Sequence, residues 1–439
     1  MNERRHRIAL LGLWIGVLLL LFRPQLHGMD TIAYYSWLRS GIIQGSLDVS
    51  DEFAHFGYLA ERGRSPTGYR INEWPVGPAL LWSPFFLAAH ALVRMANRLG
   101  IPIAADGYSA PYPMFTALGS AFYALVGLEL LRRTASRIVT PAPAFWGTIT
   151  AWLASPLIFY MSAHPFMAHA VDFFIHTLFW WEWMRNNPAS IRSRFRLGLI
   201  GGLAASVRYQ NVTLLIWPAL EDLASFLRQP WERWLRLLML GAGAGIGFLP
   251  QMIVWRVVFG QWVVGNPYGI AGAGSFDWRS PHFLDVLFST DRGLFLWTPI
   301  AAFALLGILG PLHRDHPAWA RALLGQWFLQ VYIVGSWSAW SGAAAFGPRL
   351  LIGLVPIFAF GLAALYALGE RHWRMRPVIV LSLAAILWNL ILLARYGLQD
   401  VPRMGPVPLE DLWLGQLTFP LRLLGRMGTL WHALLRQTP

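Results

Sequence analysis

The chain has 439 residues, of which 56% are hydrophobic and only 13% are charged. A soluble protein of this length needs far more polar surface, so the composition excludes a soluble globular protein and predicts a polytopic, all-helical membrane protein. The formal net charge is +13, but the basic residues are scattered among loops. They are therefore interpreted as topology signals and lipid-headgroup contacts, and no nucleic-acid partner is expected.

The first predicted element is an apolar helix that carries no charge from Ile8 to Phe22, and the basic leader Arg4–Arg7 places its start in the cytosol. Asp30 follows just beyond the lipid on the far side. A carboxylate at that depth can serve as a base for a lipid-linked substrate, or it can cap a helix that begins at Thr31. The residue taken alone does not decide between these two roles.

The first outer loop is predicted to run from about residue 23 to 74 and to contain an amphipathic helix over Thr31–Ile43. Its apolar anchors are Ile32, Leu38, Ile42 and Ile43, and its polar residues are Asp30, Tyr34 and Arg39. Such a helix would lie along the membrane surface, beside the membrane rather than across it. It would either form the floor of a cavity at headgroup level or have no catalytic role.

Further apolar segments predict a single transmembrane bundle over residues 1–439, with about eleven full spans, a later outer loop at about 259–291 and an amphipathic tail at about 396–439. The segments are Pro75–Met95, Tyr112–Leu131, Ala144–Met161, Phe166–Met184, Leu197–Val207, Val212–Leu227, Leu237–Val258, Leu294–Gly310, Ala322–Gly335, Leu350–Leu368 and Pro377–Ala394. Pro75, Pro78 and Pro84 interrupt the first of these, which predicts a partial or re-entrant helix pair there.

Loop arginines predict which connections face the cytosol. Four such loops carry Arg132, Arg133 and Arg137; Arg185, Arg192, Arg194 and Arg196; Arg228, Arg233 and Arg236; and Arg371, Arg374 and Arg376. The amino terminus is then inside and the carboxyl terminus outside. The remaining connections fall outside: the turn at 162–165, the break at 208–211, and the segments 106–109, 259–291 and 337–349.

This arrangement gathers the polar residues of the apolar segments on the outer face. They are Asp30, Asp48, Asp51, Glu52, Glu73, His164, His169, Asp172, Arg208, Asp291, Arg292 and Arg349. Polar groups at the membrane boundary are costly unless paired or hydrated, so their concentration suggests a site. Each also has a structural interpretation: Arg349 can extend to headgroups, His164 can be a turn residue, and Asp172 can pair with Arg208 across helices.

All 35 basic residues are arginine, so guanidinium groups, which favour bidentate contacts, would have to hold any phosphate. Cysteine is absent, which excludes disulfides and thiolate chemistry.

Several motifs together resemble the first outer loop of bacterial GT-C glycosyltransferases, in the branch grouped with protein O-mannosyltransferases and aminoarabinose transferases. They are Asp30-x-x-x-Tyr34-Tyr35-x-x-x-Arg39-Ser40, Gly45-Ser46-Leu47-Asp48, Asp51-Glu52, the run from Asn72 to Phe85, Asp106-Gly107-Tyr108-Ser109, and Phe346-Gly347-Pro348-Arg349. The resemblance covers most of the chain and is densest over residues 28–130. The chain departs from it in having no lysine before the prolines of the second segment, where aminoarabinose enzymes have one.

The resemblance implies a GT-C type bundle that moves one hexosyl or pentosyl unit from a polyprenyl-phosphate donor to a glycan, lipid or protein acceptor. The site would face the periplasm at the bacterial inner membrane. It implies Asp30 as the base in a one-step inverting displacement, contributing about 10²–10⁴-fold. Arg208, Arg349 and Arg39 would bind the phosphate. Tyr34 and Tyr35 would stack on the sugar, Asp51 and Glu52 would orient it or assist the base, and His164 and Asp172 would line the site.

No cofactor is expected, and an obligatory divalent cation is not favoured, because relatives with single-phosphate donors often work without one. Two rivals share the membrane span and the arginines: a transporter or flippase of a lipid-linked sugar, and a lipid-linked glycan ligase or polymerase. A transporter should show paired inverted halves, and the acidic first loop has no counterpart in the second half. A ligase should have a larger late outer loop than 259–291.

Overall fold

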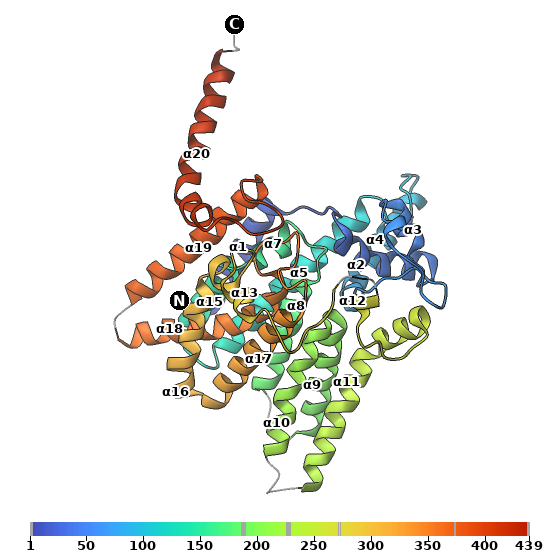
Figure 1. The fold of residues 1–439 in the computed structure, drawn as a ribbon, viewed down its shortest axis with the longest axis horizontal. Helices are drawn as coiled ribbons and strands as arrows, with labels where there is room; N and C mark the ends of the chain where they lie inside the picture. The colour runs from blue at the N-terminus through green and yellow to red at the C-terminus, as the bar shows by residue number, and fades with distance from the viewer. Residues whose placement is uncertain are drawn as a thin grey trace.

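The computed structural model describes residues 3–185, 190–224, 230–270, 272, 274–372 and 375–436, without the side chains of residues 230 and 426–436. Leu227, Arg228 and Arg374, which the sequence placed at a segment end and in two loops, lie outside this part. The described chain is helical, and its two isolated β-bridges join Arg64 to Arg70 and Phe276 to Trp337. The all-helical prediction is confirmed (Figure 1).

The α-helices are α1 (Glu3–Leu21), α2 (Met29–Arg39), α3 (Ser50–His55), α4 (Gly77–Arg98), α5 (Pro111–Ala135), α6 (Pro141–Leu153), α7 (Leu157–Ser162), α8 (His169–Arg185), α9 (Ile191–Val207), α10 (Ile216–Ala224), α11 (Pro230–Phe259), α12 (Pro267–Ile270), α13 (Phe283–Phe288), α14 (Leu294–Trp297), α15 (Ile300–Gly307), α16 (His313–Asp315), α17 (Pro317–Ser336), α18 (Val355–Arg371), α19 (Met375–Gly397) and α20 (Leu409–Arg436). Tighter or wider helical turns are η1 (Ser40–Gln44), η2 (Leu59–Glu61), η3 (Tyr209–Leu215), η4 (Ile308–Leu312) and η5 (Arg349–Leu354).

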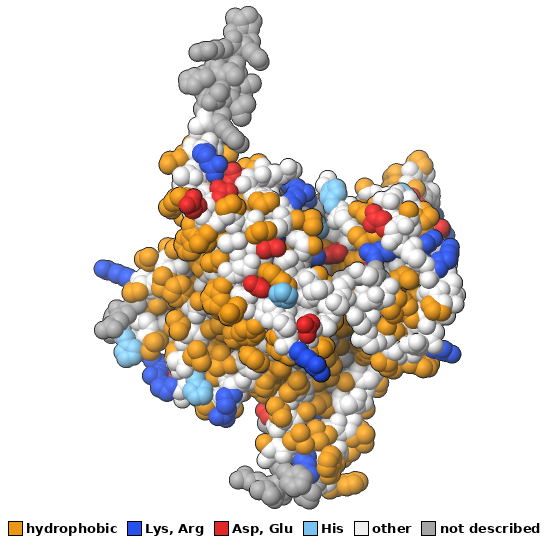
Figure 2. Space-filling view, viewed as in Figure 1, with side chains coloured by type: hydrophobic (Ala, Val, Ile, Leu, Met, Phe, Trp, Pro, Cys, Tyr) orange, Lys and Arg blue, Asp and Glu red, His pale blue; other side chains and the backbone are white. Residues whose placement is uncertain are grey.

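Five helical stretches of the described chain are long and apolar enough to cross a membrane: α4, α5, most of α11, η5 with α18, and α19. Other expected spans are interrupted. The segment Ala144–Met161 is divided into α6 and α7, and the segment from Val212 consists of η3 followed by α10. The chain is a multi-pass membrane protein. Figure 2 shows mainly apolar and uncharged side chains over the lower part of the molecule, where α10 and α11 lie.

Two expectations about the first 100 residues require correction. The predicted helix is present as α2, but Thr31 to Ser40 are buried, so the helix packs inside the protein instead of exposing one face at the membrane surface. The re-entrant pair at Pro75–Met95 is wrong, because α4 is one continuous helix with Pro84 inside it. The loop after α4 lies beside α2, because Tyr35 Oη donates to the carbonyl of Gly107 at 2.6 Å.

Helices α9 and α11 pack closely because glycines face each other across their interface. A Cβ added at Gly198 or Gly202 of α9 would overlap backbone atoms of α11, and one added at Gly243 or Gly247 would overlap backbone atoms of α9. This is the small-residue packing that lets membrane helices approach closely without a hydrophobic driving force. It fixes the end of α9, where Arg208 follows, relative to α11.

We expect Gly243→Ala to destabilise the protein by about 1–3 kcal/mol, because the added methyl group must displace backbone. Gly241→Ala is the matched control, since a Cβ there meets nothing within 4 Å. Thermal unfolding of both variants in detergent measures the difference. Equal melting temperatures would contradict the close packing of α9 on α11.

Candidate active site

An ion pair between distant parts of the chain lies at the centre of the candidate site. Asp30, in the first turn of α2, accepts a hydrogen bond from Nη1 of Arg349 at 2.6 Å, and the two side chains are 29% and 13% exposed. Asp30 does not cap α2, because the N-cap residue is Gly28 and no side chain bonds there. The capping interpretation is wrong, and the predicted proximity of Asp30 and Arg349 is confirmed.

The turn at residues 337–348 positions Arg349 at the start of η5. The backbone N–H of Phe346 donates to Tyr160 Oη at 3.0 Å, and Arg292 Nε donates to the carbonyl of Ala345 at 2.9 Å. Gly347 has φ of 61° and lies against the ring of Pro156, a backbone conformation that favours glycine. The turn is therefore fixed on two sides just before Arg349.

Arg208 follows the last turn of α9 and provides the second guanidinium of the site. Its Nη1 donates to Nδ1 of His169 at 3.0 Å. Asp172 instead accepts from Asn211 Nδ2 at 2.7 Å and is 1% exposed, so the predicted pairing of Asp172 with Arg208 is wrong. Within the described residues, no carboxylate forms an ion pair with Arg208. The guanidinium of Arg208 thus has no carboxylate counter-ion in the part of the chain that the structure describes.

The pKa values of the Tyr34 and Tyr268 hydroxyls indicate that Asp30, Arg208 and Arg349 lie near one another. Burial raises the pKa of Tyr34 well above its usual value and that of Tyr268 to about 12. In both cases Asp30 raises the pKa further, whereas Arg208 and Arg349 lower it. Both arginines and Asp30 therefore act on the same two phenol groups, one from α2 and one from α12.

Two further titratable groups lie at this centre. Burial, assisted by Arg349, lowers the pKa of His164 to about 4, so the imidazole is neutral at physiological pH. Burial raises the pKa of Glu73 to about 7, although Arg62 donates to its carboxylate at 2.8 Å and opposes the shift. Asp30 contributes to the rise. Glu73 is therefore a carboxyl group that exchanges its proton near neutral pH.

A cavity of about 880 Å³ opens beside Arg208. Its walls come from α9, η3, α11, α12 and α17, and Arg208 is the charged residue among the described residues that line it. Aromatic walls include Tyr209, Phe248, Trp255, Tyr268, Phe276, Trp278 and Trp337. We call this cavity the apolar chamber. Arg208 and Tyr268 both line the chamber, and the charges of Asp30 and Arg349 act on the Tyr268 hydroxyl, so the chamber adjoins the charged centre.

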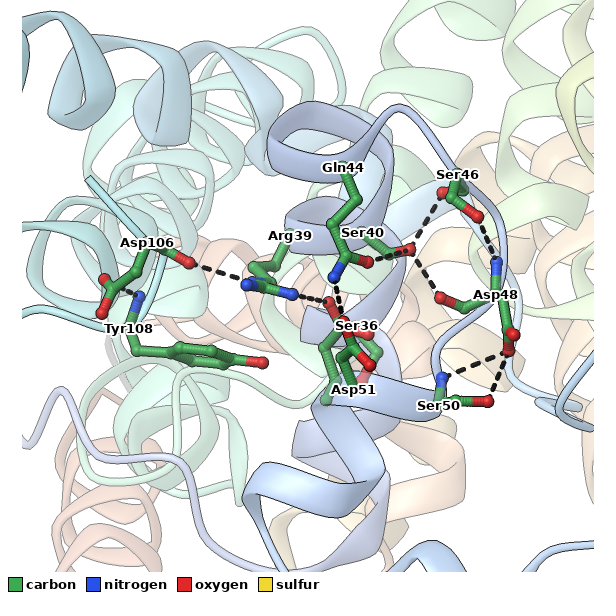
Figure 3. A network of polar contacts seen from close by, with 12 residues as sticks. Ser36, Arg39, Ser40, Gln44, Ser46, Asp48, Ser50, Asp51, Asp106 and Tyr108 are labelled. Atoms are coloured by element: carbon green, nitrogen blue, oxygen red, sulfur yellow. Dashed lines mark hydrogen bonds and ion pairs between the residues drawn. The ribbon is translucent and has the colours of Figure 1, made fainter. Parts of the chain in front are cut away.

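Four predicted substrate-binding residues of the first loop make their contacts away from the charged centre, and Figure 3 shows the network around Arg39 and Asp51. Arg39 donates to Glu52 at 2.8 Å and to the carbonyl of Asp106 at 2.9 Å, and its guanidinium lies over the Tyr108 ring. Asp51 accepts from Gln44, and Tyr35 is bound to the loop after α4. These contacts hold α2 to α3 and to neighbouring loops, and they involve Tyr35, Arg39, Asp51 and Glu52. Tyr34 and His164, in contrast, lie near Asp30.

The described ranges contain no group of three or more histidine or carboxylate side chains arranged to hold a metal ion. The charged centre offers instead the guanidinium groups of Arg208 and Arg349, two carboxyl groups that are each paired with an arginine, and neutral hydroxyl and imidazole groups. Such a donor set suits an organic anion such as a phosphate ester, which guanidinium groups bind through two parallel hydrogen bonds.

Comparison with solved structures identifies the architecture. The chain is similar to ArnT from Cupriavidus metallidurans bound to undecaprenyl phosphate, with a TM-score of 0.51, and to the same protein in the apo state, with a TM-score of 0.50. Each match has 14% sequence identity and covers 90% of this chain and 72% of the other. The chain has the fold of the GT-C glycosyltransferases. No family model and no curated protein matches the chain.

Within this GT-C fold, the sequence analysis missed one residue of the centre, Tyr268, and assigned no role there to two others, Glu73 and His169. Tyr268 gave no signal, because only the path of the 259–291 segment brings it to Asp30. Glu73 was noted as an acid at the end of the first loop, and its position before Trp74-Pro75 was the available signal. His169 was grouped with the outer polar residues, but its bond to Arg208 depends on how α8 meets α9.

We expect the stability of the folded protein to fall by up to about 3 kcal/mol between about pH 4.5 and pH 7, because of Glu73. Its pKa is raised from 4.5 to about 7, so the folded state binds the proton more tightly than the unfolded state in this window. Glu73→Gln should remove this slope in thermal melts recorded against pH. Glu61→Gln, at an exposed carboxylate, should retain it.

Proposed function

We propose that the protein is a membrane glycosyltransferase that moves one sugar, hexosyl or pentosyl, from a polyprenyl-phosphate donor to an acceptor hydroxyl. The reaction would take place at the outer face of a bacterial inner membrane, with a glycan, lipid or protein as the acceptor. The observation that carries the proposal is the apolar chamber, which ends at Arg208 beside the Asp30–Arg349 pair. A lipid with an apolar chain and an anionic head fits an apolar chamber that adjoins two guanidinium groups.

The roles of the residues follow from their positions. The isoprenoid chain occupies the apolar chamber, and Arg208 and Arg349 bind the phosphate that joins the chain to the sugar. These two cations stabilise the charge that grows on the leaving phosphate. Asp30 accepts the proton of the acceptor hydroxyl, a role that contributes about 10²–10⁴-fold to the rate. Tyr34 and Tyr268 offer buried aromatic faces to the sugar.

The other predicted residues act through these. Asp172 binds Asn211, whose backbone N–H donates to the carbonyl of Arg208, so this carboxylate positions Arg208. Arg39 and Glu52 hold α2 to α3 and to the loop after α4, and thereby fix the helix that carries Asp30. The similar structure of ArnT bound to undecaprenyl phosphate supports the donor class.

The chamber is tested by filling it. Gly245 lines the chamber and a Cβ there meets nothing within 4 Å, so Gly245→Leu adds volume without displacing backbone. We expect this variant to bind undecaprenyl phosphate at least about tenfold more weakly, a loss of roughly 1.4 kcal/mol. Quenching of tryptophan fluorescence measures binding, because Trp255, Trp278 and Trp337 line the chamber.

Gly241→Leu is the matched control. Gly241 lies one turn earlier on the same face of α11, is equally open, and does not line the chamber. Unchanged affinity in Gly245→Leu, in protein that melts normally, would contradict the assignment of the chamber to the lipid chain.

We propose that the transfer needs no divalent cation, because the two guanidinium groups supply the positive charge at the phosphate. Turnover of a polyprenyl-phosphate-linked sugar by the purified protein should be unchanged by an excess of EDTA. Loss of turnover with EDTA and its recovery with Mg²⁺, Mn²⁺ or Zn²⁺ would show that a metal shares this role.

A further inference from the structure

The charges at the reaction centre are not balanced. Arg208 and Arg349 are both cations, and Asp30 is the carboxylate that contacts either of them within the described chain. At pH 8, above its pKa of about 7, Glu73 is mostly ionised and has its own counter-ion in Arg62. The centre therefore holds one positive charge in excess when Asp30 is ionised.

The neighbouring imidazoles do not change this count. A guanidinium can only donate, so Nδ1 of His169 accepts from Arg208 and the ring carries no charge. His164 is neutral because its pKa is lowered to about 4. His27 and Arg403 also act on His164, but both are exposed, and water and salt screen them.

The excess charge fits both ends of the proposed reaction. The donor is a phosphodiester with one negative charge, which brings the centre to neutrality while Asp30 is ionised. During transfer the acceptor oxygen bonds to the anomeric carbon, and the bond from that carbon to the phosphate oxygen breaks with its electron pair left on phosphate. The acceptor proton moves to Asp30. The product phosphate then carries two negative charges, Asp30 carries none, and the centre is again neutral.

We propose that Arg349 is exchanged between Asp30 and the lipid phosphate, so that the product phosphate binds together with a proton on Asp30 and leaves when that proton is lost. The proposal rests on the proposed function and adds that release of the product phosphate requires deprotonation of Asp30. In the structure Asp30 is the carboxylate bound to Nη1 of Arg349. The carboxylate thus takes the place that a phosphate oxygen would occupy.

The surroundings of the pair support an exchange. Nε of Arg349 is buried without a hydrogen-bond partner in the described structure, so the guanidinium has donor capacity beyond the bond to Asp30. Asp30 retains 29% exposure, so a ligand can reach it. The ionisable groups that face Asp30 are Tyr34, Glu73, Tyr160, His164, Tyr268 and Arg349. Of these, Glu73 also exchanges protons near neutral pH and must be separated in the test.

Calorimetry with two lipid probes tests the exchange. At pH 8, undecaprenyl phosphate is mostly a dianion, whereas undecaprenyl methyl phosphate is a diester with one fixed charge. Titration of the full-length protein in two buffers of different ionisation enthalpy gives the number of protons bound with each lipid. We expect uptake of about one proton with undecaprenyl phosphate and none with the methyl diester.

Asp30→Asn imitates the protonated carboxyl group. We expect it to bind undecaprenyl phosphate at least about tenfold more tightly than the unaltered protein at pH 8, without proton uptake, because Arg349 no longer has an internal competitor. The gain should be smaller for the methyl diester, which brings one charge instead of two. Asp48→Asn, at a first-loop carboxylate that binds Ser50, should behave as the unaltered protein does.

The outcomes separate the two proposals. Proton uptake that persists in Asp30→Asn, or that disappears in Glu73→Gln, would overturn the exchange, as would weaker binding by an Asp30→Asn protein that melts normally. In each of these cases the unaltered protein still binds the lipid, and the proposed function stands. Failure of the unaltered, folded protein to bind either lipid would overturn the proposed function and the exchange with it.

Discussion

The candidate site depends on one ion pair, between Asp30 and Arg349, which are 319 positions apart in the chain. A carboxylate and a guanidinium at a membrane boundary are costly alone and much less costly together. The pair therefore constrains two elements. Helix α2 must carry Asp30 in its first turn, and the turn at 337–348 must place Arg349 within hydrogen-bond distance of Asp30. The hydrogen bonds of Arg292 and Tyr160 to that turn meet this second requirement.

The apolar part of the molecule places the second guanidinium. Arg208 lies where α9 ends, and the glycines between α9 and α11 allow these helices to approach until side chains larger than hydrogen would overlap backbone. The same helices form two walls of the apolar chamber. A single choice of small residues thus positions both the lipid-sized cavity and the charge at its end. Among the described residues no carboxylate pairs with Arg208, so this cation favours an anionic ligand in the cavity that it lines.

The carboxylates of the first loop divide into two groups by their partners. Glu52 is buried against Arg39 and Asp51 binds Gln44, so these residues stabilise the loop (Figure 3). Asp30 and Glu73 lie at the charged centre, and their environments differ: Asp30 is partly exposed beside Arg349, whereas Glu73 is buried and paired with Arg62. Two carboxyl groups with different partners can hold different numbers of protons at one pH, which is the usual basis for dividing acid and base roles.

The sequence alone determined the membrane class and the helical architecture, because hydropathy is a local property. It also predicted Asp30 and Arg349 on one face of the membrane, whereas their direct contact depends on the tertiary structure. The GT-C motifs in the first loop and before Arg349 gave the same fold that the solved structures support. Only the tertiary structure showed that Arg39 and Asp51 lie away from the centre and that Tyr268 lies in it. It also showed that Arg208 donates to His169, whereas Asp172 accepts from Asn211. These choices depend on which helix faces meet, and side-chain pairing across helices leaves no periodic signal in the chain. Proline spacing likewise suggested a broken helix where α4 is continuous, since neighbouring helices can support a helix around an internal proline.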